Sequence, residues 1–187
     1  MYKSRGEFLL FILGSTLMLN TLCTRNIYPK QSFNNIRDHS EKEKLNAFMK
    51  KEIEKDLTTY DVTPDDILET AGKYIGVPHC MGGTTRKCMD CSGLLFRVFA
   101  DHGIKLPHNS EEQARYGRII SNRSNLKKGD LVFFVRSYNT HRFITHSGIY
   151  AGNNEFIHTS SSRGVTITSL DNSWWNEKFI FGTRIFK

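Results

Sequence analysis

The chain has 187 residues, of which 39% are hydrophobic and 24% charged, and its formal net charge is +7. This length suggests one well-formed domain with a short extension, and the ordinary composition excludes a low-complexity or repeat protein. A basic chain could bind nucleic acid, anionic lipid or an acidic polymer such as cell wall. Its basic residues, however, are scattered along the sequence and are not gathered into a stripe. We therefore expect no nucleic-acid partner and attribute the charge first to solubility.

Residues 1–22 have the layout of a secretory signal peptide. Lys3 and Arg5 precede an apolar run over residues 8–22, which is shorter than the roughly twenty residues of a membrane span. The run stops at Cys23, which predicts a bacterial lipoprotein with Cys23 as its lipidated first residue. Leu22 stands where such signals have a small residue, so an uncleaved anchor and ordinary cleavage nearby stay open. Each alternative places the rest of the chain in the bacterial cell envelope, where paired cysteines oxidise.

Residues 23–60 are predicted to form a linker with one amphipathic helix. Charges alternate in sign over residues 41–57, where apolar side chains recur at three- and four-residue spacing: Leu45, Phe48, Met49, Ile53 and Leu57. The helix could pack on the domain or act as a spacer from the membrane, and the sequence does not distinguish between these alternatives.

Residues 61–187 are predicted to form the main domain, which begins with two helices. The first has Thr63 as N-cap and Pro64 at its first position, and it ends at Gly76. A glycine-rich loop leads to a second helix over residues 90–101, which Gly103 terminates.

Short β-branched and aromatic segments follow Asp130. They are "LVFFV", "HSGIYA", "EFIHTS", "VTITSL" and "FIFGTRIF", and turn residues separate them. Helices first and strands afterwards indicate an α+β domain, in which the helices pack on an antiparallel sheet of about five strands.

Three interpretations fit the cysteines of the loop. A zinc site would need four ligands: Cys80, Cys88 and Cys91 offer three thiols and His102 is a conceivable fourth, but the sequence has no second close pair of ligands. A redox CxxC pair would directly follow a strand in a βαβ pattern, which is absent here. In the third interpretation Cys91 alone is reactive, because the start of a helix favours an anion and lowers the pKa of a thiol.

Two histidines of the strand region could serve such a thiol. If the hairpin at "AGNNE" closes with a three-residue loop over residues 152–154, His146 lies opposite Ser160 and shares a face with His158. A two-residue loop would put the two histidines on opposite faces. On a shared face, one can accept the thiol proton while the other orients it, as in a catalytic triad.

The blocks "DCSG", "LKKGDLVFF", "THSGIYAGNNEFIHTSS" and "WWNEKFIFGTRIF" resemble the NlpC family of cell-wall cysteine peptidases. The resemblance runs from about Thr63 to Phe186. It implies a papain-like α+β fold with the nucleophile at a helix N-terminus. It also implies hydrolysis of peptidoglycan stem peptides, typically between D-glutamate and the diamino acid, without metal or cofactor.

The resemblance also implies residue roles. Cys91 is the nucleophile, His146 the base and His158 the residue that orients it. His79, Asp90, Ser92 and Ser110 are expected to bind substrate. His79 stands where the family commonly has tyrosine and His108 where it often has arginine, so details of stem recognition can differ.

Alternatives to a peptidase remain. Papain-like Cys/His sites also serve amidases and acyltransferases, and a cell-wall binding module without catalysis would need none of these roles. Cys80 and Cys88 are expected either to pair as a clamp or to stay reduced and buried.

Overall fold

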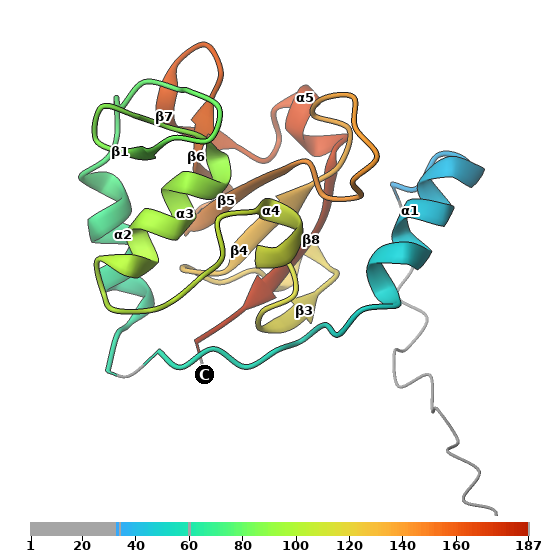
Figure 1. Cartoon of the computed structure of the whole chain (residues 1–187), viewed down its shortest axis with the longest axis horizontal. Coiled ribbons are helices and arrows are strands. Elements are labelled where there is room, and N and C mark those ends of the chain that lie inside the picture. The colour runs from blue at the N-terminus through green and yellow to red at the C-terminus, as the bar shows by residue number, and fades with distance from the viewer. Residues whose placement is uncertain (1–32, 34, 60, 187) are drawn as a thin grey trace, which may run out of the picture. The chain divides into compact units, whose positions relative to one another are not determined.

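An antiparallel six-stranded sheet, in the order β3-β8-β4-β5-β6-β7, organises the residues that the computed structural model describes, which are 33, 35–59 and 61–186 (Figure 1). The strands are β3 (Arg118–Ile120), β4 (Leu131–Phe134), β5 (His146–Gly152), β6 (Glu155–Ser160), β7 (Gly164–Ser169) and β8 (Phe179–Arg184). The five predicted strands correspond to β4–β8, and β3 is the sixth. A separate pair, β1 (Thr84–Thr85) and β2 (Cys88–Met89), lies in the cysteine loop.

Helices pack on this sheet, as the α+β prediction required. They are α1 (His39–Met49), α2 (Pro64–Gly72), α3 (Cys91–Ala100), α4 (Ser110–Gln113) and α5 (Ser173–Asn176), with a 3-10 turn, η1 (Arg123–Asn125). Helix α3 contacts α2 on one side and strands β5 and β6 on the other. It is therefore the helix that connects the sheet to the cysteine loop.

Local sequence signals determine where the two predicted helices, α2 and α3, begin and where α3 ends. Thr63 caps α2 in a capping box with Asp66: the Thr63 hydroxyl accepts a hydrogen bond from Asp66 N, and the Asp66 carboxylate accepts one from Thr63 N. Asp90 caps α3 by accepting a hydrogen bond from Gly93 N at 2.6 Å. Gly103 follows α3 at a φ of +74°, in the left-handed region that ends a helix.

Alternating side chains of β4 enter two apolar clusters, so the sheet is buried on both faces. Leu131 and Phe133 belong to the larger cluster with the helices, and Val132 and Phe134 belong to the smaller one. The smaller cluster also contains Ile120, Leu126, Phe156, Leu170 and Phe179, with Trp175 packed against it. Two-sided burial explains why "LVFF" is a continuous apolar run.

Helix α1 is shorter than predicted. It spans His39–Met49 rather than residues 41–57, because the chain beyond it becomes extended and Lys55 forms a bridge with Tyr116. Phe48 and Ile53 are buried in the larger cluster. Of the two alternatives that the sequence left open, the structure therefore shows α1 packed on the domain.

The β5–β6 hairpin has the predicted register, but its loop differs from the predicted one. Asn153 and Asn154 form a two-residue turn at φ values of 49° and 63°, as a type I′ turn requires. A bulge between Tyr150 and Gly152 then shifts the pairing, so that Ile149 pairs with Ile157. The predicted three-residue loop is wrong, but the bulge restores the register that puts His146 and His158 on one face.

The predicted signal segment and Cys23 lie outside the described residues. Among the residues that are described, no helix is long and apolar enough to cross a membrane.

Replacing Phe48 tests whether α1 is part of the folded domain. Its side chain is 2% exposed and packs against the rings of Phe143 and Phe181. Phe48→Ala should therefore lower the free energy of unfolding by about 3–5 kcal/mol, measured by chemical denaturation. Lys42→Ala, at an exposed position of the same helix, is the control and should change it by less than about 0.5 kcal/mol. Equal effects of the two changes would mean that α1 does not contribute to the core.

Candidate active site

A cavity of about 710 Å³ opens at the N-terminus of α3. Cys91 and His146 line it together with all four residues predicted to bind substrate, which are His79, Asp90, Ser92 and Ser110. The rest of the wall comes from the disulfide loop, the segment before α4, the 137–145 loop, the end of β6 and α5. The fold thus brings together residues that lie far apart in the sequence.

Cys91 is the first residue of α3 and is the free cysteine among the described residues. Its Sγ lies 3.5 Å from Ser110 Oγ, within hydrogen-bond distance for sulfur. The residue is half-buried and faces the cavity, so a substrate can reach the sulfur.

The pKa of the Cys91 thiol is raised rather than lowered, so the prediction made from its position at the helix start is wrong. Burial of the sulfur is the main cause, because it penalises the thiolate, and the neighbouring Asp90 carboxylate adds to the rise. These two effects outweigh the hydrogen bonds at the sulfur that favour a lower pKa, of which only the backbone N–H of Ser92 lies at the start of the helix. In the empty site Cys91 is a neutral thiol.

His146 and His158 are joined by a hydrogen bond of 2.9 Å between His146 Nε2 and His158 Nδ1. His158 Nε2 lies 3.0 Å from Thr168 Oγ1. If His146 Nε2 and His158 Nε2 carry the hydrogens, both contacts are satisfied and His146 Nδ1 is left as a proton acceptor. This tautomer would make His146 a base and His158 the residue that orients it.

Trp175 packs against both imidazoles, and sequence reasoning missed it. Its ring centroid lies 4.6 Å from that of His146 and 4.9 Å from that of His158. Burial lowers the pKa of His146 to about 3 and lowers that of His158 further, helped by the charge of Arg163. His146 is therefore neutral over the whole physiological range. The pair "WW" in the sequence gave no sign of which tryptophan covers the histidines.

The Asp90 carboxylate is surrounded by donors. Besides Gly93 N, it accepts hydrogen bonds from Gly82 N at 2.8 Å and Ser92 Oγ at 2.9 Å, and it contacts His108 Nε2 at 3.1 Å. Burial alone would raise the pKa of Asp90, but these bonds hold it below its usual value. Asp90 therefore connects the nucleophile helix to two walls of the cavity.

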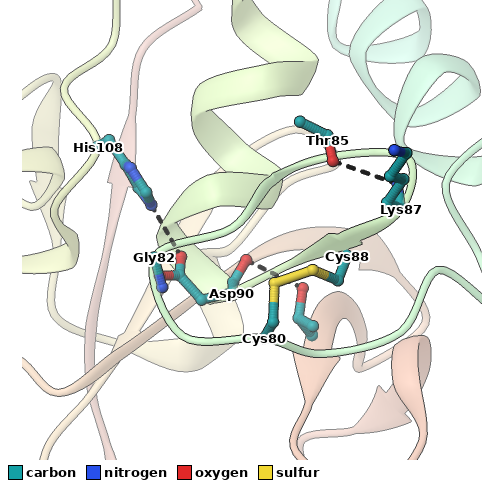
Figure 2. The surroundings of a disulfide bond; sticks show 8 residues. Cys80, Gly82, Thr85, Lys87, Cys88, Asp90 and His108 are labelled. Atoms are coloured by element: carbon teal, nitrogen blue, oxygen red, sulfur yellow. Dashed lines mark hydrogen bonds and ion pairs between the residues drawn. A yellow bond between two sulfur atoms is a disulfide. The ribbon is translucent and has the colours of Figure 1, made fainter.

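Cys80 and Cys88 form a disulfide in the loop that leads to Asp90 (Figure 2). The bond rules out the zinc interpretation, which needs both sulfurs as ligands, and the CxxC redox pair, which needs Cys88 bonded to Cys91. Of the two expectations for Cys80 and Cys88, the clamp is the one observed. Figure 2 shows Gly82, in the loop that the disulfide closes, directed at Asp90.

Glycines allow this loop to lie directly against α3. A Cβ at Gly83 would lie 2.3 Å from Cys80 Sγ, and a Cβ at Gly93 would lie 2.0 Å from Gly83 O. Both distances are shorter than real Cβ contacts allow. Gly83 and Gly93 therefore serve close packing of the disulfide loop against α3, whereas the neighbouring Gly82, at a φ of +72°, serves the turn.

Exposed aromatic and basic side chains form the outer rim of the cavity. Tyr138 and Trp174 are 48% and 53% exposed, and Arg142 lies near them on the same wall. Sequence reasoning did not single out Tyr138 and Arg142, because residues 135–145 form a loop without periodicity, and it did not single out Trp174 on α5 either. The rim can offer stacking surfaces and one positive charge to a bound peptide.

A neutral thiol, a neutral imidazole held in orientation and a helix N-terminus can together support acyl transfer by nucleophilic attack. The helix start offers backbone N–H groups where negative charge would develop on a substrate carbonyl.

Comparison with known proteins supports this chemistry. A family model described as the NlpC/P60 family matches residues 76–184. A protein named probable endopeptidase NlpC homolog, from Haemophilus influenzae, is 43% identical over 114 residues, which cover 60% of this chain and 58% of that protein. The Escherichia coli protein named murein DD-endopeptidase MepS/murein LD-carboxypeptidase is 41% identical over 120 residues, covering 64% and 61%.

A solved structure agrees with the predicted fold class. The crystal structure of an NlpC/P60 family protein from Bacillus cereus aligns with a TM-score of 0.62 and 28% identity, over 69% of this chain and 42% of that one. The papain-like α+β prediction is thereby confirmed. The chain spans about three fifths of the length of the two curated relatives.

Trp175→Ala should raise the pKa of His146 by at least about one unit, because it admits water to a ring whose pKa is lowered by burial. NMR titration of the imidazole signals measures the change. Trp174→Ala is the matched control, since Trp174 is exposed and the ring contacts of His146 are with Phe134, His158 and Trp175. An unchanged His146 titration in Trp175→Ala would contradict the role of Trp175.

Proposed function

Because this chain belongs to the NlpC/P60 family, we propose that it is a cysteine peptidase that hydrolyses stem peptides of bacterial peptidoglycan. One arrangement carries the proposal: Cys91 at the start of α3 shares a cavity with His146, whose Nε2 is held by His158. The names of the relatives, an endopeptidase and a murein peptidase, support the reaction class and the substrate.

In the proposed mechanism Cys91 attacks the scissile carbonyl as its proton passes to His146 Nδ1. Because both groups are neutral at rest, proton transfer accompanies the attack rather than preceding it. Backbone N–H groups at the start of α3, including that of Cys91, stabilise the tetrahedral oxyanion. His158 keeps His146 in the tautomer that can accept the proton.

The protonated His146 then donates to the leaving amine, and an acyl-enzyme forms on Cys91. Water, deprotonated by the same imidazole, attacks the thioester and releases the acid. Atoms balance over the two steps, and the thiol and the neutral imidazole are regenerated.

We assign stem recognition to His79, Asp90, Ser92 and Ser110 on the cavity wall. Asp90 and Ser92 are already bonded to each other, so they act mainly by fixing the shape of the wall. The bond between D-glutamate and the diamino acid is the proposed target. The name of the Escherichia coli relative refers instead to DD and LD bonds, which makes those bonds the alternative.

A papain-like amidase or acyltransferase would use the same thiol and imidazole, with another donor or acceptor of the acyl group. A binding module without catalysis would not need His146 Nε2 fixed by a second buried histidine. That arrangement favours the enzyme.

We also propose that the protein is exported and attached to the membrane through lipid on Cys23. The support is the signal-like segment before Cys23 together with the Cys80–Cys88 disulfide, which forms in oxidising compartments. The domain would then act on the cell wall from the membrane surface.

Cys91→Ala should abolish cleavage, reducing the rate by at least about a thousandfold, because the acyl-enzyme cannot form. Purified chain is incubated with defined muropeptides of known sequence, and mass spectrometry identifies the new amine. A D-glutamate terminus on the product supports the proposed bond, and a new D-alanine terminus indicates the DD alternative.

Cys91→Ser is a control of nearly equal volume that keeps a hydroxyl at the same place. It should also be inactive or nearly so, since the serine hydroxyl is a weaker nucleophile than the thiol. Cleavage by Cys91→Ala at the wild-type rate would refute the assignment of Cys91.

Cys23→Ser should move the exported protein from the membrane fraction to the soluble fraction. Fractionation of the expressing bacterium and the mass of the mature N-terminus provide the readout. An unmodified N-terminus at Cys23 in the wild type, or a membrane-bound Cys23→Ser variant, would contradict lipidation and favour another anchor.

A further inference from the structure

A buried chain of side-chain hydrogen bonds runs from Gln113 on α4 to the sulfur of Cys91. Gln113 Oε1 lies 3.2 Å from Ser147 Oγ, which lies 3.0 Å from Ser110 Oγ. Ser110 Oγ in turn lies 3.5 Å from Cys91 Sγ. Gln113 and Ser147 are fully buried, so their groups bond to each other rather than to solvent.

The orientation of the Gln113 amide is fixed by its other contacts. Its Nε2 lies 2.8 Å from the backbone oxygen of Ser92 and 2.8 Å from that of Pro107. Carbonyl oxygens only accept hydrogen bonds, so the NH₂ group must face them. The atom that faces Ser147 is therefore the amide oxygen, which also only accepts.

Counting protons then sets the direction of the whole chain. Each serine hydroxyl has one proton to donate. Ser147 donates its proton to Gln113 Oε1, because a buried acceptor left without a partner is costly. Ser110 must then donate to Ser147, and Cys91 must donate to Ser110.

We propose that Gln113, Ser147 and Ser110 form a one-way hydrogen-bond chain that holds Cys91 as a neutral thiol, with its proton directed at Ser110 Oγ. Gln113 and Ser147 are positioning residues that act through Ser110. The proposal rests on the assignment of Cys91 as nucleophile, and it adds two residues to which no role had been given.

The chain gives the thiol a resting state that differs from its reacting state. The S–H bond points at Ser110 until a substrate occupies the cavity, and it turns toward His146 when attack begins. A Ser110 hydroxyl free to donate to the sulfur would favour the thiolate, but its proton is committed to Ser147. In an oxidising compartment the neutral resting thiol protects the enzyme, because the thiolate is the form that oxidants and disulfides attack.

The ionisable groups that face the thiol do not change when these serines are replaced. Asp90 at the start of α3, His146 on β5 and Tyr138 on the 137–145 loop share the cavity with Cys91. His108, Arg142 and His79 line the same cavity. A shift in the pKa of Cys91 in a serine variant therefore reports on the hydroxyl chain.

Ser147→Ala provides the main test, because it frees the Ser110 proton to stabilise the thiolate. The apparent pKa of Cys91 should fall by about one unit, so that alkylation by iodoacetamide at pH 7 becomes about tenfold faster. Alkylation of the full chain is followed from pH 5 to pH 10, and peptide mass spectrometry assigns the label to Cys91. An unchanged or higher pKa overturns the proposal.

Ser110→Ala provides a second, independent test of the hydrogen-bond direction. If Ser110 accepts from the thiol, its removal leaves the pKa of Cys91 equal or lower; a rise would show that Ser110 donates to the thiolate, and would overturn the proposal. This variant keeps Ser147 bonded to Gln113, so it remains informative if Ser147→Ala fails to fold. Ser124→Ala, an exposed serine outside the cavity, is the control and should leave the pKa unchanged.

The measurement needs no turnover, so it separates this proposal from the proposed function. If Cys91→Ala retains cleavage, the assignment of Cys91 as the nucleophile fails regardless of the alkylation result. If Cys91→Ala is inactive but Ser147→Ala alkylates like the wild type, only the hydrogen-bond chain is refuted.

Discussion

The Asp90 carboxylate is the contact on which the candidate site depends. It caps the helix that begins with Cys91, and it also accepts from Gly82 in the disulfide loop and contacts His108 of the cavity wall. One buried charge with four neighbouring donors therefore fixes both the position of the thiol and the shape of the cavity. The same charge has a cost, because it lies next to the sulfur and disfavours the thiolate. A helix start capped by a carboxylate is thus a good place to hold a thiol and a poor place to ionise one.

Because the thiol at this position is hard to ionise, its base must be neutral and able to accept a proton, which explains why the histidine pair is buried. An exposed imidazole would be partly protonated near neutral pH and could not accept a proton in that form. Trp175 and the smaller apolar cluster lower the pKa of His146 to about 3, so the base is always available but weak. With a raised thiol pKa and a lowered imidazole pKa, a thiolate–imidazolium pair is scarce in the empty site. Charge therefore develops only when a bound carbonyl, facing the helix start, can receive it.

Sequence patterns were enough for the parts of this arrangement that depend on local chemistry. The Thr63 cap, the glycine stop at Gly103 and the β-branched and aromatic segments of β4–β8 act over a few residues, and they predicted the helices, the strands and the place of Cys91. The end of α1, the bulge next to Tyr150 and the cover that Trp175 gives to the histidines depend on tertiary contacts, which no local period records. The sign of the Cys91 pKa shift was predicted wrongly for the same reason: the helix start is visible in the sequence, whereas burial of the sulfur is not.

Gln113 shows how tightly such tertiary contacts can specify one residue. Its amide bonds the carbonyl of Ser92 on α3, the carbonyl of Pro107 and the hydroxyl of Ser147 on β5. Glutamate would keep the acceptor but lose both donors to the carbonyls, and leucine would leave two buried carbonyls and one hydroxyl without their partner. Only a primary amide of this length offers two donors and one acceptor in the required directions. The residue that joins α3, α4 and β5 is therefore also the one that sets the direction of the serine protons, so one buried side chain links the packing of the fold to the hydrogen bond of the Cys91 thiol.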